Sequence, residues 1–209
     1  MPVQAYESLL RKDRIRAHDE IDSFFLRTGK VYDTLSDVTR KLEDAHIPYA
    51  LVGGLALGEH GMDRMTVDVD ILLTKEGLEA FRAKYEGFGY VPAFSGAQKQ
   101  FRSTETGVRI DFITTGEFPG DGKPKPVVFP DPSNSYVEIN GIRVITLEKF
   151  IELKLASGMT AAHRGQDLTD VQKLIQERQL PLQFADTLDE SVREGYRLKW
   201  RHAQVHDSH

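Results

Sequence analysis

Cysteine is absent from this chain of 209 residues, which excludes disulfide bonds and thiolate metal sites. Long apolar runs are missing too, since none approaches the roughly 18–20 residues that a membrane span needs. The N-terminal stretch, MPVQAYESLLRKDRIRAHDE, is polar and charged and lacks the pattern of a secretory signal. Together these absences predict a cytoplasmic protein with no membrane partner.

The chain also lacks an excess of basic residues. It has 27 lysines and arginines against 32 aspartates and glutamates, which gives a formal net charge of −5. Proteins that grip long nucleic acids by their phosphates usually carry such a surplus. Two local basic clusters, RKDRIR at 11–16 and REGYRLKWR at 193–201, are compatible with phosphate-facing patches or with solvated helix faces. The composition, 40% hydrophobic and 28% charged, indicates a globular chain with one compact core.

The hydrophobic pattern predicts an α/β (α+β) fold, a mixed β-sheet flanked by helices. Three-to-four-residue spacing predicts helices at 4–28 with a break, 30–45, 55–61, 75–90, 147–158 (ended by Gly158), 164–179 and from about 185 onward. Strands are expected near 47–54, 67–74, 90–94, 100–104 and 108–115, with a hairpin at 135–146 that turns at Asn140-Gly141. The chain then divides into an N-terminal helical segment (1–45), a sheet-containing core (46–146) and a C-terminal helical part (147–209), forming one compact unit.

Two aspartates lie inside an otherwise apolar run, MTVDVDILL, at residues 65–73. Residues i and i+2 of a strand share one face, so Asp68 and Asp70 lie together while Val69 and Ile71 face the other side. Two neighbouring carboxylates repel each other, and burial raises the cost of their charge. A divalent cation removes both problems, and Mg²⁺ prefers one or two carboxylates together with phosphate oxygens and water. The stretch therefore predicts a metal site, the alternative being an acidic strand face open to solvent.

Two further features accompany this pair. Gly53 and Gly54 follow a strand and precede a helix, where a backbone without side chains can approach a phosphate or simply make a tight turn. Asp111 is again a lone carboxylate in an apolar strand, VRIDFI. If that strand lies beside the strand of Asp68, three carboxylates converge as in two-metal phosphoryl-transfer sites. Alternatively, Asp111 pairs with Arg109, which shares its face.

The order of these motifs resembles that of the nucleotidyltransferase superfamily of the polymerase-beta type. In both, a strand ends in Gly-Gly, the next strand carries Asp-x-Asp, and a later strand carries a third Asp. The 13 residues between Gly54 and Asp68 are at the upper end of the family's spacing. The segment YALVGGLALGEHGMDRMTVDVDIL resembles the AbiEii/MenT-like toxin branch of this superfamily. That branch also has a lysine in a later helix, then an arginine followed by Asp-x-x-Asp. The matching residues are Arg64, Thr66, Lys154, Arg164, Asp167 and Asp170, whereas Gln166 stands where the branch often has a basic residue.

The resemblance implies Mg²⁺, or Mn²⁺, as the cofactor, with three residues as metal ligands and catalytic groups: Asp68, Asp70 and Asp111. It also implies a set of nucleotide-binding residues: Gly53, Gly54, Arg64, Thr66, Lys154, Arg164 and Asp167. Asp111 would help to bind the metal that activates the acceptor hydroxyl or act as its base, and Lys154 would neutralise phosphate charge. The alternatives are a surface lysine at Lys154 and a structural ion pair between Arg64 and one of the paired aspartates.

The expected function is Mg²⁺-dependent transfer of NMP from an NTP to an acceptor hydroxyl. Members of the resembled branch are often toxins of toxin–antitoxin pairs, and some modify the acceptor end of tRNA, which implies tRNA or another RNA and a cognate antitoxin as partners. The modest acidity leaves a small-molecule acceptor open, as in antibiotic-modifying relatives. A non-catalytic module that binds a nucleotide or a partner protein is the rival from another class.

Overall fold

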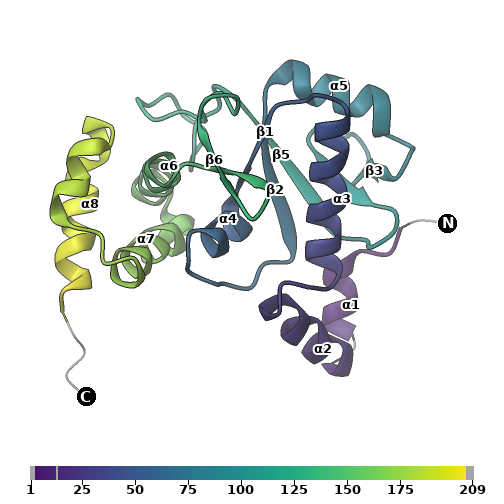
Figure 1. Ribbon diagram of the computed structural model, residues 1–209, viewed down its shortest axis with the longest axis horizontal. Helices are drawn as coiled ribbons and strands as arrows, with labels where there is room; N and C mark the ends of the chain where they lie inside the picture. Colours follow the sequence, from purple (N-terminus) through teal and green to yellow (C-terminus); the bar gives the residue numbers. More distant parts are fainter. Residues whose placement is uncertain (1–2, 13, 206–209) are drawn as a thin grey trace.

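The computed structural model describes residues 3–12 and 14–205 (Figure 1). One seven-stranded sheet has the order β3-β4-β5-β2-β1-β7-β6. Its strands are β1 (Tyr49–Val52), β2 (Asp68–Leu73), β3 (Tyr90–Pro92), β4 (Gln100–Ser103), β5 (Arg109–Thr114), β6 (Tyr136–Ile139) and β7 (Ile142–Ile145). The β2–β5 and β1–β7 pairs are parallel and the other four are antiparallel, so the expected mixed sheet is confirmed.

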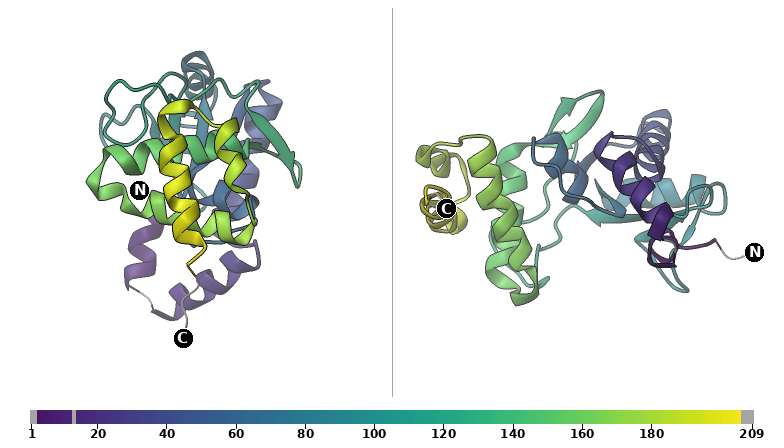
Figure 2. Two further views of the ribbon diagram at one scale, coloured as in Figure 1. Left: turned by 90° about the vertical axis from the view of Figure 1, so that its left-hand side faces the viewer. Right: turned by 90° about the horizontal axis from the view of Figure 1, so that it is seen from below.

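Eight α-helices of the described residues surround this sheet. They are α1 (Tyr6–Lys12), α2 (Arg14–Phe25), α3 (Lys30–Asp44), α4 (Gly53–Glu59), α5 (Lys75–Tyr85), α6 (Leu147–Thr160), α7 (Gly165–Glu177) and α8 (Glu190–Ala203). Two 3₁₀ turns, Ala162–Arg164 and Leu182–Thr187, flank α7. Helices α6, α7 and α8 gather at one end of the molecule and α1 and α2 at the other (Figures 1 and 2).

One continuous hydrophobic core joins all three segments, from Tyr6 in α1 to Ala203 in α8. On the face of the sheet away from the aspartates, Phe81 of α5 contacts the rings of Phe112 and Phe101, with centroid distances of 4.6 and 5.8 Å. None of the helices in the described part of the chain combines the length and apolarity that a bilayer crossing requires.

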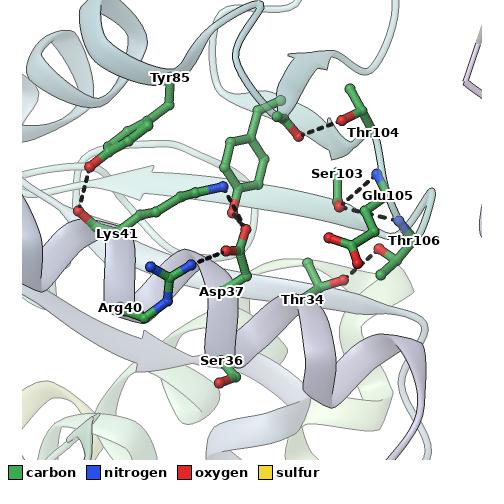
Figure 3. A network of polar contacts seen from close by, with 12 residues as sticks. Thr34, Ser36, Asp37, Arg40, Lys41, Tyr85, Ser103, Thr104, Glu105 and Thr106 are labelled. Atoms are coloured by element: carbon green, nitrogen blue, oxygen red, sulfur yellow. Dashed lines mark hydrogen bonds and ion pairs between the residues drawn. The ribbon is translucent and has the colours of Figure 1, made fainter.

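A polar network fastens α3 to the sheet edge (Figure 3). Asp37 accepts hydrogen bonds from Arg40 at 2.7 Å, from Lys41 at 2.8 Å and from the Tyr90 hydroxyl at 2.7 Å. Although burial opposes its charge, these hydrogen bonds, from Lys41 and Tyr90 above all, hold the pKa of Asp37 below its usual value. The Tyr85 hydroxyl donates to the Lys41 carbonyl at 2.9 Å, so α5 joins the same network.

The hairpin turn at Asn140 and Gly141 is confirmed, since both residues have positive φ, 52° and 78°. The expected end of a helix at Gly158 is wrong, because α6 continues to Thr160. A Cβ on Gly158 would lie 2.5 Å from the Leu168 side chain, so this glycine permits close packing of α6 on α7. The sequence also predicts fraying of the final stretch, HAQVHDSH at 202–209, of which 206–209 lie outside the described residues.

Candidate active site

Strand pairing brings the three predicted carboxylates to one face of the sheet. Strands β2 and β5 are parallel neighbours, so the condition that the sequence left open is met, with Asp70 in register with Asp111 and Asp68 in register with Arg109. The alternating burial of β5 places Ile110 and Phe112 in the core and turns Asp111 the other way.

Arg109 contacts two of the three carboxylates. Its Nη2 donates to Oδ2 of Asp68 at 2.7 Å, and its Nε lies 3.1 Å from Oδ1 of Asp111. The second contact lacks hydrogen-bond geometry, so Asp111 Oδ1 and Arg109 Nε are buried without a hydrogen-bond partner. The other oxygen of Asp68 accepts from the Thr66 hydroxyl at 2.6 Å. The pairing of Asp111 with Arg109 that the sequence left open is therefore present.

The pKa of Asp70 is strongly shifted by its surroundings. Burial, with the nearby charges of Asp68 and Asp111, raises its pKa to about 7, against a smaller opposing effect of Lys154. Burial also raises the pKa of Asp111. Gly53, with φ of 66°, packs directly on Asp70, because a Cβ there would lie 1.8 Å from Asp70 Oδ2. The carboxylate thus explains why glycine stands at the start of α4.

Lys154 of α6 is the centre of a buried ionic cluster. Its Nζ donates to Oδ1 of Asp167 at 2.6 Å and to Oδ2 of Asp170 at 3.0 Å. Ser157 donates to the other Asp167 oxygen at 2.6 Å, and Gln166 to the other Asp170 oxygen at 2.9 Å. The Lys154 side chain is only 12% exposed, so the surface-lysine alternative is wrong.

Arg64 joins this cluster from the segment before β2. Its Nη2 lies 3.6 Å from Oδ2 of Asp170, whose side chain is fully buried. Arg64 therefore pairs with an aspartate of α7 and not, as the sequence alternative had it, with Asp68 or Asp70. The pair links the β2 entry segment to α7.

A cavity of about 610 Å³ lies next to both groups of residues. Its walls contain six of the residues singled out by sequence: Gly53, Asp70, Asp111, Lys154, Arg164 and Asp167. Four others do not line it: Gly54, Arg64, Thr66 and Asp68. Thr66 contacts Asp68 and Arg64 contacts Asp170, and neither aspartate lines the cavity.

Several lining residues were not predicted. They come from the β3–β4 connection, the loop after β5 and the α6 face, and include Phe94, Lys99, Glu117, Phe118, Phe129, Phe150 and Ser157. Part of this set had a signal in the sequence, because Phe150, Lys154 and Ser157 are spaced at i, i+4 and i+7 on one helix face. The loop residues had none, since the irregular chain after β5 has no periodicity to read.

The residues present fit a hard divalent cation in part. Asp70 and Asp111 are adjacent, both line the cavity, and Asp111 Oδ1 is a buried acceptor without a donor. Oxygen ligands of this kind suit Mg²⁺ and Mn²⁺. Within residues 3–12 and 14–205, however, no three acidic or histidine side chains already form a ligand cluster. The third carboxylate, Asp68, is held by Arg109 and Thr66.

No protein-family model and no curated protein match the chain. Among solved structures it is similar to the antibiotic-resistance factor ANT(2'')-Ia in solution, with 14% identity, a TM-score of 0.52 and coverage of 82% of this chain and 96% of that chain. It is also similar to ANT(2'')-Ia in complex with adenylyl-2''-tobramycin (12% identity, TM-score 0.48, coverage 83% and 98%). A nucleotidyltransferase-like protein from Paracoccidioides brasiliensis has 18% identity, a TM-score of 0.46 and coverage of 70% and 75%. With its mixed seven-stranded sheet, the chain has a nucleotidyltransferase-like fold.

Proposed function

We propose that this protein is a divalent-metal-dependent nucleotidyltransferase that moves NMP from an NTP to an acceptor hydroxyl. The observation that carries the proposal is the pair Asp70 and Asp111, in register on neighbouring strands and both on the wall of one cavity. Burial raises the pKa of both carboxylates in spite of the nearby Arg109, and a bound divalent cation would offset this cost.

In the proposed reaction, the acceptor oxygen forms a bond to the α-phosphorus, and the bond from that phosphorus to the bridging oxygen breaks, releasing pyrophosphate. A bound Mg²⁺ or Mn²⁺ would neutralise phosphate charge and favour the deprotonated acceptor. Asp70 and Asp111 would hold it, with Asp68 as a third ligand. Asp111, which lines the cavity, would also accept the proton of the acceptor hydroxyl.

The rest of the cavity suits a nucleotide. Lys154, Arg164 and Lys99 provide positive charge for the triphosphate, and four phenylalanines provide apolar surface for a base: Phe94, Phe118, Phe129 and Phe150. In this proposal Gly53 and Asp167 complete the wall, while Gly54, Arg64 and Thr66 support the site from behind it.

The acceptor proposed first is an RNA end, in particular the acceptor end of tRNA, with the protein acting as a toxin restrained by a cognate antitoxin. This follows from the resemblance of the Gly-Gly and Asp-x-Asp region to the AbiEii/MenT-like branch. The second candidate is a small cationic polyhydroxyl compound. This candidate is favoured by the charge of the cavity wall, where carboxylates outnumber basic side chains by four to three. The carboxylates are Asp70, Asp111, Glu117 and Asp167, and the basic side chains are Lys99, Lys154 and Arg164.

The test is incubation of the purified protein with each α-labelled NTP and Mg²⁺, with total tRNA in one arm and aminoglycosides in another. Label on a tRNA-sized band supports the RNA acceptor, and label on a low-mass product supports the small acceptor. Asp70→Asn should remove the label in either arm. Binding of Mg-NTP without transfer to any acceptor would contradict the proposal and favour a non-catalytic nucleotide-binding module.

A further inference from the structure

Arg109 is placed where a metal site would need its carboxylates free. It reaches two of the three, with Nη2 at 2.7 Å from Asp68 Oδ2 and Nε at 3.1 Å from Asp111 Oδ1. Both carboxylate side chains are 20% exposed and the arginine is 34% exposed, so this is a half-sheltered contact and not a loose surface pair. The Thr66 hydroxyl occupies the other oxygen of Asp68.

The contact is incompletely satisfied. Arg109 Nε and Asp111 Oδ1 are both buried without hydrogen-bond geometry to any partner, although they lie close together. A guanidinium forms its strongest contacts as a planar fork on one carboxylate. Here it is divided between two carboxylates on neighbouring strands, which makes it a weaker partner for each.

A third acidic group, Glu7, lies near Arg109 in addition to Asp68 and Asp111. Arg102 lies in register with Arg109 on β4, and it pairs with Glu7 of α1 at 2.8 Å. The charge of Glu7 also acts on Arg109 and on Asp111. Glu7 remains paired with Arg102, so a displaced Arg109 stays near a further negative charge without gaining a free carboxylate.

A divalent cation and Arg109 repel each other strongly if both bind the carboxylate oxygens of Asp68 and Asp111. Mg²⁺ binds carboxylate oxygens at about 2.0–2.1 Å, and a guanidinium nitrogen on the same oxygen would hold two cations within a few ångströms. At that separation their repulsion is large in a half-buried site. Recruitment of Asp68 as a third ligand therefore requires that the Arg109–Asp68 hydrogen bond break.

We infer that Arg109 is an exchangeable internal counter-ion, which holds Asp68 and Asp111 together in the metal-free protein and is displaced when a divalent cation binds. This rests on the proposed function, because it assigns Arg109 a role toward the metal of that reaction. Arg109 is a positioning residue that sets the metal concentration at which the three-carboxylate site assembles.

The test is Mn²⁺ binding measured by the loss of the free-ion electron paramagnetic resonance signal, with no nucleotide present. Arg109→Gln removes the competing cation and should tighten Mn²⁺ binding by about three- to tenfold, the scale of removing one nearby half-screened charge. Arg102→Gln is the matched control, an arginine in register on the next strand with its own acidic partner, and it should change binding by less than about twofold. Arg109→Lys, which keeps the charge without the fork, should give an intermediate value and replaces the first variant if circular dichroism shows Arg109→Gln to be unfolded.

The wild type could bind Mn²⁺ while the folded Arg109 variants bind it with equal or lower affinity. That result would overturn the inference and leave the proposed transferase intact. Equal tightening in Arg102→Gln would overturn it too, since net charge alone would then explain the effect. Binding by Arg109→Gln but not by the wild type would support the inference and contradict the proposed transferase. Absence of binding in every protein would contradict both.

Discussion

At the scale of single residues, the charge of Asp70 is the least stable feature of the metal-free site. Burial and the neighbouring charges of Asp68 and Asp111 raise its pKa to about 7, and Gly53 packs directly against its carboxylate. Asp68, by contrast, has Arg109 and Thr66 as partners. Two aspartates separated by a single residue thus differ in their contacts as well as in position.

Asp70→Asn should stabilise the metal-free fold in a pH-dependent way. Because the folded pKa, about 7, lies above the unfolded value, the folded chain binds this proton more tightly, and the free energy of unfolding falls as pH rises from about 4 to 7. The variant lacks this titrating group. Its free energy of unfolding should therefore exceed that of the wild type by about 1–4 kcal/mol above pH 7, and the difference should shrink toward pH 4.

Urea unfolding of both proteins with EDTA at pH 5 and pH 8 measures the difference. Substitution of the exposed Asp44 by asparagine is the control for loss of one carboxylate from the surface. A variant that is less stable than the wild type at pH 8, or whose advantage does not change with pH, would contradict the electrostatic account of Asp70.

The sequence predicted which residues share the acidic face but not how they divide their roles. The two-residue period placed Asp68 beside Asp70, whereas the addition of Asp111 depended on the β2–β5 pairing that the structure shows. That Asp70 lines the cavity while Asp68 is held by Arg109 depends on the register of β2 with β5, which sets Arg109 opposite Asp68, and on the start of α4, where Gly53 packs on Asp70. Neither is encoded in the local pattern of residues.

At the scale of secondary structure elements, Lys154 joins α6 to α7. Lys154→Ala would leave the buried carboxylates of Asp167 and Asp170 without their cation, which typically costs about 3–5 kcal/mol. We expect a large loss of unfolding free energy in urea, with the exposed Lys173→Ala changing it by less than about 0.5 kcal/mol. Unchanged stability would contradict this structural role of Lys154 and leave it only the proposed contact with the triphosphate.

Gly158 tests the packing of the same two helices. Alanine favours a helix over glycine by about 1 kcal/mol, but a Cβ here would meet Leu168 at 2.5 Å. Gly158→Ala should therefore destabilise the protein by about 1–3 kcal/mol in thermal or urea unfolding. Gly165→Ala, at the start of α7 with no atom near its Cβ and a helical φ of −55°, should be neutral or stabilising. A Gly158→Ala variant as stable as the wild type would show that α6 and α7 can separate without loss.

The misplaced helix end at Gly158 has the same physical origin. A glycine after an apolar helical run is typical of a helix end, and nothing local distinguishes that role from close packing. The packing partner, Leu168, lies in the next helix. Helices and strands with strong periodicity, such as α3 and β5, were predictable because their pattern is local.

At the scale of the whole molecule, the cavity is assembled from segments far apart in the chain. Its walls combine the starts of β2 and α4, the β3–β4 connection, the loop after β5 and the inner face of α6. The C-terminal helices stand at one end of the molecule, with α6 and α7 between the sheet and α8 (Figures 1 and 2). No sequence pattern predicts such a meeting, which is why the aromatic and loop residues of the wall were missed.

The central claim is that this fold carries out nucleotidyl transfer and does not only hold a nucleotide, and Asp111→Asn tests it most directly. Asp68 and Asp70 remain in this variant, so Mg-NTP binding should persist, whereas loss of the carboxylate that activates the acceptor should lower transfer by about 10²–10⁴-fold. Binding and transfer are measured on the same preparation, by equilibrium dialysis of labelled Mg-NTP and by label incorporated into the acceptor, with Asp44→Asn as the control. Retained binding with transfer reduced to this degree is the predicted result. Transfer by Asp111→Asn at the wild-type rate would contradict the account.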